Sequence, residues 1–119
     1  MHAIHDLRLF DTAIILSLNN EHAQETSTLD DSGLTALLDM AFYARGIDRG
    51  ATAFLIALDQ SASYENRNFA YFKASRKSFV YIDRIIVSSS ARGLGLGRLL
   101  YDDLLPWRNK PGILEWSVR

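Results

Sequence analysis

The chain has 119 residues, which is long enough for one domain with a single core. Hydrophobic residues make up 48% of it, a share too high for a disordered segment. Its net charge of -1 gives no strong attraction for nucleic acid or an anionic membrane, and the absence of cysteine excludes disulfides, Cys-ligated zinc and a cysteine nucleophile. There is no signal-peptide pattern and no apolar run near the roughly 20 residues that span a bilayer. We therefore expect one cytoplasmic domain over residues 1–119, with no nucleic-acid or membrane partner.

The N-terminal segment predicts a short strand followed by a helix. Ala3–Phe10 alternates as a strand does, and Asp11 occupies an N-cap position before a helix over Thr12–Glu25. Asn19 and Asn20 weaken this helix because asparagine side chains compete for backbone hydrogen bonds. We expect the helix to end or bend there.

A second helix and a buried strand are predicted next. The helix begins after Asp30 or Asp31 and continues to about Ala44, with Gly46 as its stop. Ala51–Leu58 is a nearly continuous apolar run, whose length and flanks indicate a strand covered on both faces.

The stretch Phe79–Leu105 predicts a strand, a glycine loop and a helix. Phe79–Val87 is rich in β-branched and aromatic residues, and the small polar residues Ser88–Ala91 end the strand. Three glycines follow two residues apart: Gly93, Gly95 and Gly97.

The predicted helix after the glycines has one apolar face. That face is Leu96, Leu99, Leu100 and Leu104. Asp102 and Asp103 lie on the opposite side, and Pro106 is expected to end the helix.

A strand that leads through a glycine loop into the start of a helix directs several backbone N–H groups toward the same point. Together with the positive end of the helix, they predict a site for a phosphate or pyrophosphate.

Two common phosphate-binding motifs do not match this loop. A Walker A loop needs a Lys-Ser/Thr pair after the last glycine, and none follows Gly97. A Rossmann G-x-G-x-x-G pattern would need glycine where Arg98 stands. Two alternatives to a coenzyme-binding loop are open. The loop is a glycine-rich turn without a ligand, or it belongs to an unrelated α/β protein that binds a nucleotide.

The run Arg92-Gly93-Leu94-Gly95-Leu96-Gly97 resembles the R/Q-x-x-G-x-G/A signature of the GNAT acyltransferase superfamily. The resemblance implies an α/β (α+β) fold, with a mixed, mostly antiparallel sheet flanked by helices. It also implies acetyl-CoA as co-substrate, its pyrophosphate on the glycine loop and its pantetheine arm beside the preceding strand, with no metal. The implied coenzyme-binding residues are Ile85, Ile86, Val87, Arg92, Gly93, Leu94, Gly95, Leu96, Gly97 and Arg98.

The resemblance also implies acetyl transfer to a small-molecule or peptide amine, which needs a base for the amine and an acid for the thiolate. Strict alternation would place Phe79, Tyr81, Asp83, Ile85 and Val87 on one face. Asp83 is the predicted base, and a structural Asp83–Arg84 pair is the equal alternative. Tyr81 or Tyr101 is the candidate acid, although such tyrosines are more often core or groove residues whose hydroxyl has a hydrogen-bond partner.

The resemblance also implies that three polar residues of the first helix region contact the acceptor. They are Asn19, Asn20 and Glu25, and a solvated helix end is the alternative. His2, His5 and Asp6 are not expected to hold a metal, because ligand sets need positioned supporting groups.

The family fold continues past this helix with a splayed strand, a further helix and a hairpin. Only 15 residues follow Leu104, and of these Ile113–Val118 predicts the splayed strand. The later helix and hairpin are expected to be missing, so a non-catalytic acyl-CoA binding module, or a domain that needs a partner chain, is the alternative to an enzyme. An open sheet edge also predicts a homodimer.

Overall fold

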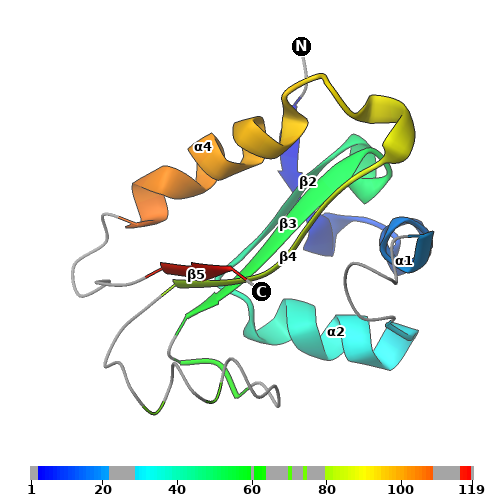
Figure 1. The fold of residues 1–119 in the computed structure, drawn as a ribbon. Coiled ribbons are helices and arrows are strands. Elements are labelled where there is room, and N and C mark those ends of the chain that lie inside the picture. Colours follow the sequence, from blue (N-terminus) through cyan, green and yellow to red (C-terminus); the bar gives the residue numbers. More distant parts are fainter. Residues whose placement is uncertain are drawn as a thin grey trace.

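The computed structural model describes residues 3–21, 29–59, 61–63, 70, 74, 80–108 and 116–118. Its sheet has five strands in the order β1-β2-β3-β4-β5, of which the first four are antiparallel and β5 runs parallel to β4. The strands are β1 (Ile4–Asp6), β2 (Tyr43–Ile47), β3 (Ala53–Asp59), β4 (Val80–Val87) and β5 (Trp116–Val118). Two helices cover one face and a third covers the other (Figure 1). They are α1 (Thr12–Glu21) and α2 (Asp31–Met40) on the first face and α4 (Leu96–Arg108) on the second. This confirms the predicted mixed, mostly antiparallel sheet between helices.

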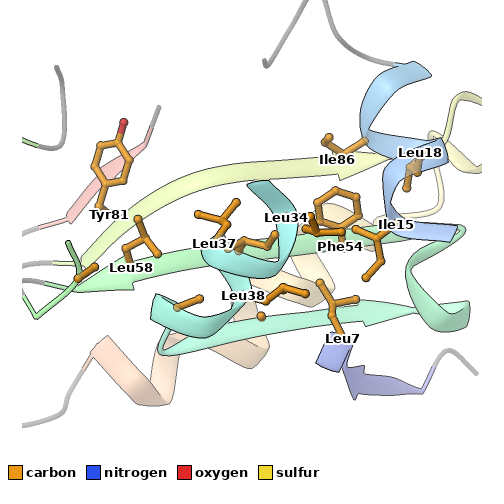
Figure 2. Packing of buried hydrophobic residues seen from close by; sticks show 14 residues of the cluster. Leu7, Ile15, Leu18, Leu34, Leu37, Leu38, Phe54, Leu58, Tyr81 and Ile86 are labelled. Carbon is orange, nitrogen blue, oxygen red and sulfur yellow. The ribbon is translucent and has the colours of Figure 1, made fainter. Parts of the chain in front are cut away.

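Each face of the sheet has its own hydrophobic core. Figure 2 shows the core under α1 and α2, where Phe54 and Leu58 of β3 meet leucines and isoleucines of the two helices. On the other face, Leu96, Leu100 and Leu104 of α4 pack against the sheet. Because β3 lies between both cores, every residue from Ala53 to Leu58 is fully buried, which explains its continuous apolar sequence.

The two predicted helix starts are confirmed. The Asp11 carboxylate accepts a hydrogen bond from the amide of Ala13 at 2.9 Å. Asp30 is the N-cap of α2, and its carboxylate accepts from the amide of Gly33 at 2.7 Å. These bonds satisfy amides that have no partner inside the helix.

Two boundaries in the N-terminal half differ from the prediction. The first strand is only Ile4–Asp6, because Leu7–Leu9 forms a 3-10 turn (η1) in which the Asp6 side chain accepts from the Arg8 amide. The helix predicted to reach Ala44 ends at Met40, and β2 begins at Tyr43. Pairing with both β1 and β3 stabilises this segment as a strand, and that pairing overrides the helical spacing of its apolar residues.

Gly46 does not stop a helix but lies within β2. A Cβ atom there would be 2.7 Å from Cδ2 of Leu7 and 2.8 Å from the carbonyl oxygen of Ala53. Close approach of neighbouring atoms therefore requires glycine at this position. The next turn, η2 (Asp48–Gly50), joins β2 to β3.

The C-terminal half follows the prediction with one correction. β4 ends at Val87 and is followed by a 3-10 turn, η3 (Ser89–Ala91), as the small polar residues indicated. Pro106 does not end α4, which continues to Arg108. A proline removes one hydrogen bond from the helix, and so near the end of α4 the remaining bonds still hold the last turn. The strand predicted at Ile113–Val118 is confirmed over Trp116–Val118.

Candidate functional site

A hollow of about 410 Å³ opens where β4 passes through η3 into α4. Its lining is Ile85, Ile86, Val87, Ala91, Arg92, Gly93, Gly95, Leu96 and Gly97. Most of the predicted coenzyme residues are therefore brought together. Leu94 and Arg98 are not in the lining: Leu94 is 62% exposed, and the Arg98 side chain lies 3.8 Å from the Asp102 carboxylate on the outer surface of α4. Ala91 lines the hollow although it was not predicted, because an alanine carries no chemical signal in a sequence.

The loop in this hollow depends on glycine backbone conformations. Gly93 has φ 88° and Gly95 has φ 74°, in the left-handed region that other residues avoid. No atom lies within 4 Å of the position that a Cβ would take at either glycine. The loop backbone is therefore open on that side, where a ligand can approach it closely.

The start of α4 supplies donors to the same hollow. The first helical bond in this turn runs from the amide of Leu99 to the carbonyl of Gly95, at 3.0 Å. Amides in the first turn have no partner four residues earlier inside the helix, and the helix dipole makes this end positive. Arg92 adds a full positive charge to the lining. The hollow is therefore suited to an anion such as a phosphate.

The edge of β4 that faces β5 is paired over only part of its length. β5 pairs with Val80, Tyr81 and Ile82, and in the described part of the chain no strand pairs with Ile85–Val87 on that side (Figure 1). A strand edge presents backbone N–H and C=O groups that hydrogen-bond an extended ligand. This edge leads directly into the loop that contains Gly93 and Gly95.

A β-bulge in β4 overturns the predicted strict alternation. Arg84 pairs with Ile56 and Ile82 pairs with Ala57, so β4 has one residue more than β3 between these two pairs, which is Asp83. One extra residue shifts the alternation of side chains that follow it. Val80 and Ile82 before the bulge, and Ile85 and Val87 after it, therefore all face α4, whereas Tyr81 and Ile86 face α1 and α2. The prediction that Tyr81, Asp83, Ile85 and Val87 share one face is wrong, and Phe79 lies outside the described residues.

Asp83 and Arg84 form a buried ion pair. Both side chains have no exposed surface, and Nε of Arg84 lies 2.7 Å from Oδ2 of Asp83. Nη1 of Arg84 also donates to Oδ1 of Asn19 in α1, at 2.7 Å. The pairing that the sequence allowed as the alternative to a catalytic Asp83 is therefore present.

The predicted tyrosines lie on opposite sides of the sheet. Tyr81 is fully buried in the core beneath α1 and α2, on the other face from the residues that pack under α4 (Figure 2). Tyr101 lies half-buried on α4, where burial raises the pKa of its phenol. The structure thus separates Tyr81 from the side of the sheet that α4 covers, and Tyr101 lies on that side.

The predicted acceptor contacts have partners inside the protein. Asn19 is fully buried and donates from Nδ2 to Oδ1 of Asn20, at 2.9 Å. Asn20 in turn bonds the backbone of Leu29. Glu25 lies outside the described residues.

A polar cluster that the sequence did not indicate anchors α4 to the sheet. The Tyr43 hydroxyl donates to Oδ2 of Asp103 at 2.8 Å, and Nη1 of Arg45 lies 3.1 Å from the same oxygen. Burial, with the hydrogen bond to Asp103, raises the pKa of Tyr43 far above its usual range. Asp103 was predicted on the solvent side with Asp102. Its partners lie about 60 positions earlier in the chain, so only the folded chain shows the contact.

The described part of the molecule contains neither a metal-binding group of side chains nor a membrane-spanning helix. No three histidine, cysteine, aspartate or glutamate side chains gather there in a group that would hold a metal ion. None of the helices described is long and apolar enough to cross a membrane.

The sequence matches a family model described as "Acetyltransferase (GNAT) family" over residues 17–119. This match covers most of the chain, from within α1 to β5, and includes the whole hollow. The chain therefore belongs to the GNAT acetyltransferase family. A search of curated protein sequences gave no match.

Solved structures of acetyltransferases share the fold over the full length of this chain. A ribosomal-protein-alanine N-acetyltransferase from Brucella melitensis biovar Abortus 2308 has a TM-score of 0.63 at 21% identity, and the match covers 100% of this chain and 78% of that one. An acetyltransferase from Trypanosoma brucei has a TM-score of 0.62 at 17% identity, with 100% and 81% covered. An aminoglycoside acetyltransferase from an uncultured soil metagenomic sample, in complex with sisomicin, has a TM-score of 0.61 at 19% identity, with 100% and 76% covered. At these identities the likeness concerns the fold alone.

Proposed function

We propose that the protein binds acetyl-CoA in the hollow between β4 and α4 and transfers the acetyl group to a small-molecule or peptide amine. The observation that carries this proposal is the continuity between the edge at Ile85–Val87, which none of the described strands covers on the β5 side, and the glycine loop at the start of α4. Acetyl-CoA has the same order of groups, with an extended pantetheine arm that leads to a pyrophosphate. Amides at the start of α4 and the Arg92 guanidinium would bind the pyrophosphate, and the β4 edge would bind the arm.

The bulge in β4 lies at the end of this edge nearest β5. An extended arm that runs from the loop along Val87, Ile86 and Ile85 reaches this bulge next, so we place the thioester end of acetyl-CoA near Asp83. Asp83 remains the proposed base, although its buried pair with Arg84 also gives it a structural task.

The direct test is thermal unfolding of the protein with CoA, acetyl-CoA and ATP. We expect CoA and acetyl-CoA to raise the melting temperature, because a ligand that binds only the folded state stabilises it, and ATP to have a much smaller effect. Equal stabilisation by ATP would instead indicate a general nucleotide site. Acetylation of a panel of amines, containing a polyamine, an amino acid, an alanine-started peptide and an aminoglycoside, then measures transfer.

A second candidate function is coenzyme binding without transfer. The burial of both predicted catalytic side chains favours it: Asp83 is held by Arg84, and Tyr81 lies in the opposite core. In that case acetyl-CoA stabilises the protein and no amine in the panel is acetylated.

A further inference from the structure

The hydroxyl of Tyr101 lacks a hydrogen-bond partner among the residues that the structure describes. Its side chain is half-buried on α4, and burial raises the pKa of the phenol, so the hydroxyl keeps its proton and remains a donor. Tyr43, the other tyrosine that contacts α4, differs because it donates to Asp103 at 2.8 Å. A tyrosine hydroxyl that is taken out of water usually has a partner. The hydroxyl of Tyr101 is therefore available to a ligand.

The position of Tyr101 on α4 decides which part of the sheet it faces. One flank of the helix faces β2, where Asp103 contacts Tyr43. The opposite flank faces β4, because a Cβ atom at Gly97 would lie 3.8 Å from Cδ1 of Ile85. Residues four apart lie on the same side of a helix, so Tyr101 shares the flank of Gly97. It therefore faces the edge of β4 rather than β1 and β2.

The spacing along the helix places Tyr101 beside the edge of β4 that leads from the hollow to the bulge. From the loop, α4 runs back toward the end of the sheet where β5 lies (Figure 1). Four residues separate Gly97, which lines the hollow, from Tyr101, and they advance the helix by about 6 Å. The same distance along a strand is about two residues, which leads from Ile85 to Asp83.

The surroundings of Tyr101 combine apolar surface with this one donor. Its ring packs against the core on the α4 side of the sheet, as Ile85 and Val87 also do. Sites for small molecules are typically apolar surfaces with a few placed polar groups. The pantetheine arm has matching chemistry, since it alternates methylene groups with amides whose carbonyls accept hydrogen bonds.

We propose that Tyr101 binds the coenzyme arm, with its ring against the methylene groups and its hydroxyl donating a hydrogen bond to an amide carbonyl of the arm. The inference rests on the proposed function, because it takes the arm of acetyl-CoA to lie along the β4 edge. An arm bound there is itself an outermost strand, whose far side offers unpaired carbonyls. Tyr101 thus favours ligands that carry an arm over nucleotides that have only the pyrophosphate.

The test compares two variants that each lose one hydroxyl. Tyr101→Phe keeps the ring and removes the donor that has no partner among the described residues. Tyr43→Phe is the matched control, since its hydroxyl already donates to Asp103 inside the protein. The two probes are CoA and ADP, because ADP has a pyrophosphate and lacks the arm.

Three quantities are measured for the wild type and both variants. They are the Kd of CoA, the Kd of ADP and the melting temperature without ligand. For Tyr101→Phe we expect the Kd of CoA to rise by about 2- to 12-fold, the range for one lost hydrogen bond, with the Kd of ADP and the melting temperature unchanged. Tyr43→Phe should show the reverse, a lower melting temperature with the wild-type Kd for CoA.

An unchanged Kd of CoA in Tyr101→Phe would overturn the inference, even if turnover fell, because the hydroxyl would then act in the reaction and not in binding. An equal rise in the Kd of ADP would overturn it as well, since the change would affect the loop rather than the arm. A lower melting temperature in Tyr101→Phe would assign the hydroxyl a partner inside the protein, with the same consequence. A wild type that does not bind CoA would instead overturn the proposed function, so the two failures are distinguishable.

Discussion

Replacement of Gly95 by alanine tests whether coenzyme binding depends on the left-handed backbone conformation of the loop. Gly95 has φ 74°, and a residue with a Cβ atom in the left-handed region costs about 1–2 kcal/mol. The new Cβ meets no protein atom within 4 Å, so backbone strain is the only direct cost. If the variant loop relaxes and must regain this conformation to bind, the same 1–2 kcal/mol weakens coenzyme binding by about 5- to 30-fold.

The assay is calorimetric titration of CoA into the wild type, Gly95→Ala and Gly97→Ala, with thermal unfolding of each protein. Gly97 lies within α4, and a Cβ there would make ordinary contacts with Ile85 and Val87 at 3.8 and 3.9 Å. Gly97→Ala therefore adds the same methyl group without strain, and any loss of affinity in it reports close approach of the ligand. Gly95→Val should bind more weakly than Gly95→Ala, because a β-branched side chain suits this backbone region least.

A folded Gly95→Ala protein with unchanged CoA affinity and unchanged stability would refute this reasoning. It would mean that neither the left-handed conformation nor the open side of the loop matters to the ligand. A loss confined to stability would show that the strained loop persists and that CoA does not approach it closely at this residue.

Three further predictions concern catalysis, the anchor of α4 and assembly. Asp83→Asn should lower the free energy of unfolding by about 3–5 kcal/mol, since it leaves the buried Arg84 charge without its carboxylate. Because Asp83 is also the proposed base, turnover of the folded variant should fall by about 100- to 10,000-fold, and wild-type turnover would assign Asp83 to structure alone. Tyr43→Phe should cost about 1.5–3 kcal/mol through the lost bond to Asp103. The pKa of Tyr43 is raised in the folded state, so the folded protein keeps this proton at pH values where the unfolded chain loses it. The free energy of unfolding of the wild type should therefore fall as pH rises above about 10. Denaturant titrations of Tyr43→Phe should not show the share of this decrease that Tyr43 causes. We also propose that the β5 edge of the sheet pairs with a second copy; light scattering over a concentration series should show a dimer, and a monomer at every concentration would contradict it.

The local sequence determined the part of the site that depends on backbone conformation. A strand rich in β-branched residues, a break of small polar residues and glycines two apart predicted β4, η3 and the start of α4. The glycines predicted a loop that other residues cannot form, and Gly93 and Gly95 have the positive φ values that explain it. The helix N-caps at Asp11 and Asp30 were predictable for the same reason, because each bond closes over two or three residues.

The tertiary structure decided the features that depend on residues far apart in the chain. Whether 43–47 became helix or strand was settled by its pairing with β1 and β3, which supply hydrogen bonds that no local pattern reveals. The bulge at Asp83 exists because β3 and β4 differ by one residue across their pairing, and it moved Tyr81 to the opposite face from Ile85. The buried contact of Arg84 with Asn19, and that of Asp103 with Tyr43, join positions about 60 residues apart. Burial of such groups is stable only when a partner meets them in space, and a partner's position is a property of the folded chain.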